Sequence, residues 1–138
     1  MKNRSELREI AMKVLYQIDI LEDAKQEVDK ASLIKEQLEI ENDFVNELID
    51  GVLENKKAIK KLANDHLSGW TIDRLSKVDK AILEIGIYEL MYTKTPSVVS
   101  INEAIELSKK YSDEKVTKMI NACLDKIYHE NEGQIDEQ

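Results

Sequence analysis

Two arginines near the start of the chain have the spacing of a phosphate-binding pair. Arg4 and Arg8 are four residues apart, so on a helix their side chains lie along the same edge. A guanidinium group binds phosphate oxygens through a planar fork of N–H donors. Lys2 and Lys13 make the same segment locally basic. Such a pair also occurs on ordinary solvated helices, so the spacing alone leaves both interpretations open.

These basic residues contrast with the acidity of the whole chain. The 138 residues include 28 Asp and Glu against 20 Lys and Arg, which gives a formal net charge of −8. Negative charge opposes an RNA backbone but favours the docking of a basic protein. A second basic cluster, ordinary in isolation, lies near the predicted turn before the last helix: Lys109, Lys110, Lys115 and Lys118.

The residues that could hold a metal ion or act as a catalytic base are few and badly spaced. A di-iron bundle needs Glu three residues before His, but Ala63 precedes His66 and Lys126 precedes His129 at that distance. Glycine-rich phosphate loops are absent. We interpret His66 as a packed histidine at the rim of a helix and Cys123 as a small core residue. We therefore expect no enzyme, no catalytic or metal site, no cofactor and no small-molecule substrate.

Composition favours an all-α fold. Four glycines and one proline are too few for the turns of a β-sandwich or the loops of a parallel sheet. We expect one compact domain over residues 1–138, built as a bundle of six to seven helices, with 129–138 as a frayed acidic tail. No apolar run reaches the roughly 20 residues that span a bilayer, and charges interrupt the N-terminal segment. We therefore expect a cytoplasmic protein that does not bind membranes.

Apolar residues recur at helical spacing along most of the chain. Stripes over 7–21, 44–63 and 116–127 each predict a helix with one buried face, and a shorter helix is expected around 33–38. Polar residues at the borders can cap helices. The expected caps are Ser5 for the first helix, Ser76 for the central one, a capping box from Ser100 to Glu103, and Ser112 or Asp113 for the last.

The segment 78–92 is predicted to be a buried central helix. It is apolar nearly all round, with Glu84 and Glu89 as its interior charges. Gly51 and Gly86 interrupt helical patterns, where glycine costs about 1 kcal/mol against alanine. We interpret both as points where two helices approach closely.

Four segments, in order and with similar spacing, resemble the signature blocks of the NusB family of bacterial transcription antitermination factors. They cover 44–52, 78–90, 101–109 and 121–127. The opening Arg8-Glu9, followed by Leu15-Tyr16, is similar to the first helix of that family. The resemblance extends from Arg4 to Ile127.

This resemblance implies an all-helical domain that binds the boxA element of nascent ribosomal RNA transcripts. Binding is joint with a small-subunit ribosomal protein, NusE, in an antitermination complex on RNA polymerase. By the resemblance, the RNA-binding positions are Lys2, Arg4, Arg8, Lys118, Met119 and Asn121. The positions that face the ribosomal protein are Tyr16, Asp73 and Asp79.

The chain departs from the family pattern in its basic and aromatic residues. Ser5 and Glu6 stand where further arginines are common, and Met119 replaces a phenylalanine that could stack on a base. Ala122 replaces a usual glycine. One alternative is an acidic helical module that binds proteins but has no RNA binding of its own. A second is a targeting piece like the domains fused to RNA cytosine methyltransferases.

Overall fold

The computed structural model describes residues 2–136, and over these residues all of the regular secondary structure is helical. It contains eight α-helices, one 3-10 turn and no strand. The elements are α1 (Arg4–Asp23), α2 (Lys30–Gln37), α3 (Asp43–Glu54), α4 (Lys56–His66), η1 (Ile72–Arg74), α5 (Lys77–Tyr92), α6 (Ser97–Tyr111), α7 (Glu114–Glu130) and α8 (Glu132–Asp136). The expected all-α fold is confirmed, and α8 is the one helix shorter than eight residues in this part of the chain.

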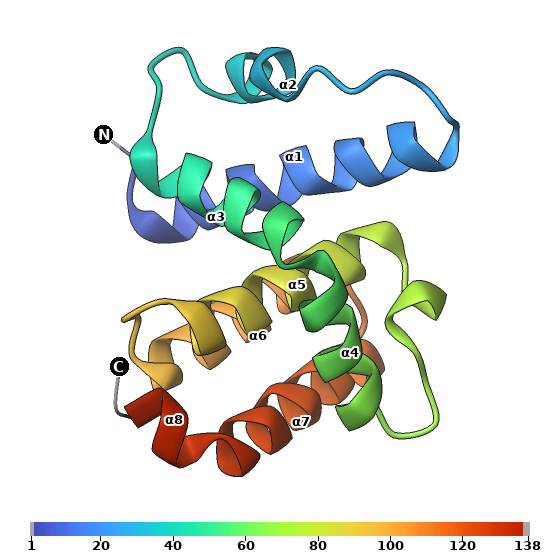
Figure 1. The fold of residues 1–138 in the computed structure, drawn as a ribbon, viewed down its shortest axis with the longest axis vertical. Helices are drawn as coiled ribbons and strands as arrows, with labels where there is room; N and C mark the ends of the chain where they lie inside the picture. The colour runs from blue at the N-terminus through green and yellow to red at the C-terminus, as the bar shows by residue number, and fades with distance from the viewer. Residues whose placement is uncertain (1, 137–138) are drawn as a thin grey trace.

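Two layers of helices meet around α5. Helices α1, α2 and α3 form one layer, and α4, α6, α7 and α8 lie with α5 in the other (Figure 1). Helix α5 contacts α1, α3, α4, α6 and α7, and every residue from 81 to 91 is buried. The predicted central helix is therefore confirmed. Its nearly all-round apolar surface is explained because neighbours cover it on every side.

Glycines let the helices pack closely around α5. A Cβ atom at position 51 would overlap the ring of Tyr88. A Cβ atom at position 86 would lie 3.1 Å from Leu124 Cδ1 and 3.3 Å from the Cβ of Ala104. The interpretation of both glycines as points of close helix approach is confirmed.

Three helix boundaries differ from the sequence-based expectation. Asn3, rather than Ser5, caps α1 by accepting a hydrogen bond from the Glu6 amide at 2.9 Å. The predicted long helix over 44–63 is two helices, because α3 ends at Glu54 and is capped by Asn55, whose side-chain amide donates to the Gly51 carbonyl at 2.8 Å. Helix α6 begins directly after Pro96, so Ser100 lies buried inside the helix and forms no capping box.

Other local predictions are confirmed. Ser76 caps α5 and Asp113 caps α7 through their side-chain oxygens. Cys123 is fully buried in the core, and burial raises the pKa of its thiol to about 12. His66 is buried, with Nδ1 2.7 Å from the Leu62 carbonyl oxygen.

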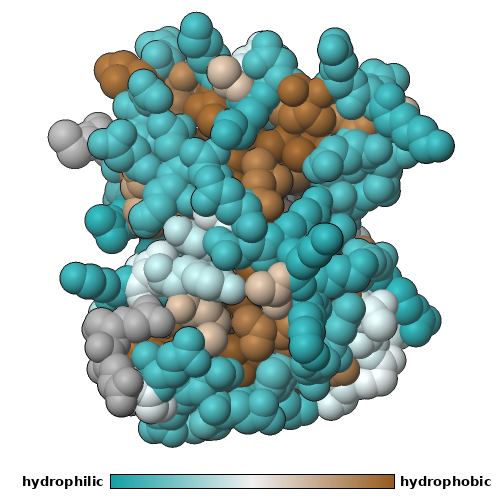
Figure 2. Space-filling view, in the orientation of Figure 1, coloured by the Kyte–Doolittle hydropathy of each residue, from teal (hydrophilic) through white to brown (hydrophobic). Residues whose placement is uncertain are grey.

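The C-terminal segment is helical through Asp136. His66 Nε2 lies 2.6 Å from Glu130 Oε2, so the end of α7 is fastened to α4. The frayed state of residues 129–138 stays a prediction, and its last two residues lie outside the described part of the chain. No helix within 2–136 is long and apolar enough to cross a membrane. The face in Figure 2 is mostly hydrophilic, with groups of hydrophobic residues in its upper and lower halves between the hydrophilic ones.

Candidate functional site

The structure separates the two arginines that the sequence placed on one exposed edge. Arg4 is exposed, whereas Arg8 is 2% exposed. Arg8 donates from Nε to Glu89 Oε1 at 2.6 Å and from Nη2 to Glu89 Oε2 at 2.8 Å. Its Nη1 atom lies 3.5 Å from a carboxylate oxygen of Glu103. An exposed pair was expected, but Arg8 falls on the buried stripe of α1, where it neutralises a carboxylate of the central helix.

Burial and ion pairing act in opposite directions on Arg8. Burial alone would lower the pKa of its guanidinium, but the hydrogen bonds to Glu89 and the charge of Glu103 outweigh it, and the pKa is raised. The sequence contained a signal for this pair, since Glu89 stood as a charge within an apolar helix and a buried carboxylate needs a partner. The identity of the partner depended on the packing of α1 against α5.

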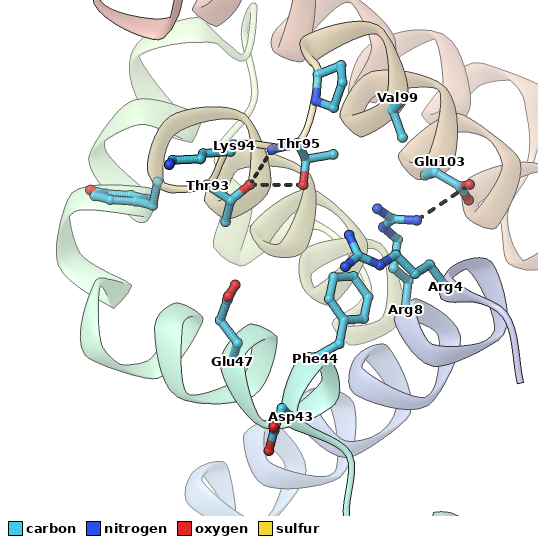
Figure 3. Close-up of a pocket in the computed structure, with 12 residues that line it drawn as sticks. Arg4, Arg8, Asp43, Phe44, Glu47, Thr93, Lys94, Thr95, Val99 and Glu103 are labelled. Carbon is cyan, nitrogen blue, oxygen red and sulfur yellow. Dashed lines mark hydrogen bonds and ion pairs between the residues drawn. The ribbon is translucent and has the colours of Figure 1, made fainter. Parts of the chain in front are cut away.

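A pocket opens beside this ion pair, where α1, α3 and the turn between α5 and α6 meet (Figure 3). The guanidinium carbon of Arg4 lies 4.6 Å from the centre of the Phe44 ring, and that of Arg8 lies 5.3 Å from it. We call this the Phe44 pocket; its lining includes Arg4, Arg8, Phe44, Tyr92, Lys94 and Glu103. Among these residues, only the arginines were sequence-predicted RNA contacts.

The remaining predicted RNA-binding residues lie on other parts of the surface. Lys2 is exposed and precedes α1. Lys118 is exposed near the start of α7 and pairs with Glu114 at 3.3 Å, whereas Met119 and Asn121 are half-buried. The contact of these residues with RNA stays a prediction.

Helix α6 lies between the two predicted RNA-binding segments. On its α1 side, Ser5 Oγ donates to Glu103 Oε1 at 2.7 Å, and Lys110 Nζ donates to Glu9 Oε1 at 2.8 Å. On its α7 side, Asn121 lines a groove shared with α6. Both segments thus flank one helix and are not separated by the bulk of the molecule.

The three residues predicted to face a protein partner have different degrees of exposure. Asp73 is exposed on η1, Tyr16 is half-buried on α1, and Asp79 is 7% exposed in the first turn of α5. Asp79 accepts a hydrogen bond from Ser76 Oγ at 2.9 Å and another from Ser112. Burial raises the pKa of Asp79, and the nearby charge of Asp113 raises it further. Asp79 therefore joins the start of α5 to the end of α6.

A network of ion pairs links the Tyr16 edge of α1 to Asp73. Asp19 lies one turn beyond Tyr16, and its carboxylate is 3.5 Å from Lys80 Nζ. Lys80 Nζ is also 3.3 Å from Asp73, which in turn pairs with Lys60 at 2.6 Å. The bond to Lys60 is the main reason that the pKa of Asp73 is lowered. Asp19, Lys60 and Lys80 carry no signal in the sequence, because their pairing depends on elements that are separate in the chain.

Glu84 lies beneath this network. It is 7% exposed, and burial raises its pKa to about 7 against the opposing charge of Lys80. A buried carboxyl group of this kind shifts its proton equilibrium instead of carrying a full charge in the core.

No metal-binding arrangement occurs in the described part of the chain. Within it, no three His, Cys, Asp or Glu side chains cluster so as to hold an ion.

Comparison with known proteins gives consistent results along nearly the whole chain. The model of the NusB family matches residues 5–129. The transcription antitermination protein NusB of Oceanobacillus iheyensis is 41% identical over 126 residues, which cover 91% of this chain and 98% of that protein. The structure of T. maritima NusB has a TM-score of 0.80 at 31% identity and covers 94% of this chain and 92% of that one.

A further solved structure contains other macromolecules. It is a crystal structure of the antitermination factors NusB and NusE in complex with double-stranded RNA. It matches with a TM-score of 0.77 at 29% identity, and the match covers 92% of this chain and 96% of that chain.

Proposed function

Because this chain belongs to the NusB family of transcription antitermination proteins, we propose that it binds boxA RNA jointly with the small-subunit ribosomal protein NusE. This pair then joins an antitermination complex on RNA polymerase. Membership of the family also means that the chain is a non-enzymatic factor. The observation that carries the proposal is the likeness, over 92% of this chain, to a protein crystallised with NusE and RNA.

The charge of the chain supports a division of labour between the two proteins. A net charge of −8 repels an RNA backbone. A basic ribosomal protein docked on the acidic surface offsets that repulsion. The attraction between the oppositely charged surfaces of the two proteins also speeds their association. The RNA then needs only a local basic patch on this chain, and its sequence is read from unstacked bases.

We assign the predicted residues to roles that follow their exposure. Lys2, Arg4 and Lys118 are exposed and contact RNA directly, together with Met119 and Asn121. Arg8 is buried under Arg4, and it positions the first helix and Phe44 for that contact.

The face for the ribosomal protein is assigned in the same way. Tyr16 and the exposed Asp73 form the contact surface, and the buried Asp19 supports it through its ion pair with Lys80. Asp79 is buried, so it supports this surface by holding Ser76 and Ser112.

Fluorescence anisotropy with a labelled boxA RNA tests the proposal directly. The chain alone is expected to bind weakly, because its net charge opposes the RNA. The complex with NusE is expected to bind roughly ten times more tightly or better, since partner charge and added contacts both favour binding. Equal affinities for the chain and the complex would contradict the joint mode of binding.

Variants of exposed residues separate the two faces. Arg4→Glu is expected to weaken RNA binding by the complex and to leave affinity for NusE unchanged in calorimetry. Asp73→Asn is expected to weaken NusE binding, and Asp65→Asn is its control, because Asp65 is an exposed aspartate that pairs with Lys61. Loss of NusE affinity in both Arg4→Glu and Asp73→Asn would show that the faces are wrongly assigned. Binding of NusE with no RNA binding by the pair would favour the protein-only module.

A further inference from the structure

The Phe44 pocket has a flat stacking surface on two sides. On one side, the Arg4 guanidinium lies over the Phe44 ring at 4.6 Å. On another, the Tyr92 ring is 42% exposed and stacks on Tyr88, with ring centres 5.6 Å apart and planes 20° from parallel. Guanidinium planes and aromatic rings are the surfaces on which proteins stack unstacked RNA bases.

Two basic groups at the rim of this pocket have no carboxylate partner and can bind a ligand. Arg4 and Lys94 are exposed, and neither forms an ion pair with a carboxylate in the described part of the chain. By contrast, two other basic residues on α1 and α6 form ion pairs with carboxylates: Arg8 with Glu89, and Lys110 with Glu9. Two unpaired cations beside two stacking surfaces match the chemistry of a nucleotide, which joins a phosphate to a flat base.

Glu47 supplies a polar group that can contact the edge of a base. It is exposed and points from α3 toward the turn at Thr93 (Figure 3). Its carboxylate makes no hydrogen bond or ion pair within residues 2–136. A carboxylate accepts hydrogen bonds from the amino group of a base, such as N4 of cytosine.

Hydrogen bonds hold the floor of the pocket in place. Thr95 Oγ1 donates to Glu89 Oε2 at 3.1 Å, next to the bonds from Arg8. Thr93 Oγ1 donates to the Glu89 backbone carbonyl at 2.7 Å, and the Thr95 amide donates to Thr93 Oγ1 at 3.2 Å. The turn that carries Lys94 is therefore preorganised, which lowers the entropic cost of binding a ligand there.

We propose that the Phe44 pocket is a subsite for one unstacked nucleotide of a single-stranded RNA. The base lies between the Arg4–Phe44 pair and Tyr92, an amino group of the base donates to Glu47, and Lys94 binds the adjacent phosphate. The proposal rests on the proposed RNA-binding function and adds to it a specific place for one nucleotide.

Substitutions of Tyr92 and Lys94 test the subsite without changing any of the residues that were predicted from the sequence to bind RNA. Tyr92→Leu keeps apolar bulk and removes the ring, and Lys94→Ala removes the charge. Loss of one stacked base is expected to weaken binding of boxA RNA by the complex with NusE about fivefold or more in Tyr92→Leu. Lys57→Ala is the matched control for Lys94→Ala, because Lys57 is an exposed lysine on α4 with no ion pair in the described residues.

Scanning the RNA with abasic positions gives a second, independent measurement. At one position, loss of the base is expected to weaken binding to the wild-type complex but to have little further effect in Tyr92→Leu, since the two changes remove the same contact. Circular dichroism melting curves check that both variants are folded at the temperature of the binding assay. Lys94→Ala is expected to melt like the wild type because Lys94 is exposed and unpaired, and Tyr92→Leu is expected to melt slightly lower because it loses the stacking on Tyr88.

The outcomes distinguish the subsite from the wider function. If the wild-type complex does not bind boxA RNA, the proposed function itself is wrong. If the wild-type complex binds and Tyr92→Leu and Lys94→Ala bind equally well, the RNA does not use the Phe44 pocket. Losses that are additive at every abasic position would also overturn the subsite, because Tyr92 would then act on no particular base.

Discussion

Arg8 and Glu89 are 81 residues apart in the sequence, yet two hydrogen bonds of 2.6 and 2.8 Å join them in the interior. Their side chains are 3% and 2% exposed. This pair ties the first helix to the central helix directly beneath the Phe44 pocket. A residue that sequence alone suggests as an RNA contact therefore supports the architecture on which the contact depends.

Replacing Arg8 is expected to destabilise the whole domain. Arg8→Ala leaves the Glu89 carboxylate buried without its partner, which costs about 3–5 kcal/mol in free energy of unfolding. Arg8→Lys keeps the positive charge but not the bidentate hydrogen bonding to Glu89, so it recovers only part of the lost free energy of unfolding. Urea denaturation followed by circular dichroism measures both. Exposed Arg4→Ala is the control, and a loss from Arg8→Ala no larger than from Arg4→Ala would contradict the assignment.

Gly51→Ala is expected to lower stability although alanine is the better helix former. The added methyl group would overlap the Tyr88 ring, and overpacking of this kind costs about 1–3 kcal/mol. Gly133→Ala is the matched control, because a Cβ at that position meets nothing within 4 Å. Thermal melts of the two variants make the comparison. A gain in stability from Gly51→Ala would show that α3 is free to move away from α5.

The buried carboxyl group of Glu84 gives a pH dependence with a definite sign. Its pKa is about 7 in the folded chain, against 4.5 for an ordinary glutamate, so the folded state holds a proton that the unfolded state releases. Between these two values, its contribution to stability falls as pH rises. Glu84→Gln is expected to gain on the order of 2 kcal/mol over the wild type above pH 7.5, and the difference should shrink toward pH 4.5.

Urea denaturation between pH 4.5 and 8 measures this effect. Glu36→Gln, on an exposed position of α2, is the control for a change of net charge. A constant difference between Glu84→Gln and wild type across the range would mean that Glu84 ionises normally.

The single thiol is expected to be unreactive in the folded chain. Cys123 is fully buried, and its pKa of about 12 leaves almost no thiolate at pH 8. A thiol reagent that absorbs on reaction should therefore label the native protein only slowly and the urea-unfolded protein at once. Fast labelling without denaturant would show that α7 opens readily from the core.

Much of the fold could be predicted from the sequence, because apolar spacing depends on local geometry. The stripe of α1 and the all-round apolar surface of α5 directly reflect how many neighbours each helix has. The break at Asn55 could not be predicted in this way. The apolar stripe continues through it, and the end of α3 is marked by the non-helical backbone of Asn55 and by the bond from its side chain to the Gly51 carbonyl.

The candidate site was less predictable, because it combines segments that lie far apart in the sequence. Spacing suggested that Arg4 and Arg8 act together, but α5 determines that only Arg4 reaches the surface. Phe44 belonged to the apolar stripe over 44–63 and to the block 44–52, but neither pattern pointed to a pocket, and Lys94 belonged to no motif. A pocket built from α1, α3 and one turn leaves no periodic signal. The burial of Asp79 likewise depends on Ser112, which lies beyond the next helix.

The contact between Gly51 and Tyr88 also fixes a dimension of the surface. Helix α3 carries Phe44 and Glu47, and helix α5 ends at Tyr92. Because glycine at position 51 allows α3 and α5 to pack closely, it sets the distance between Phe44 on α3 and Tyr92 at the end of α5. The width of the proposed base-binding subsite therefore depends on Gly51, a buried residue that does not contact the ligand.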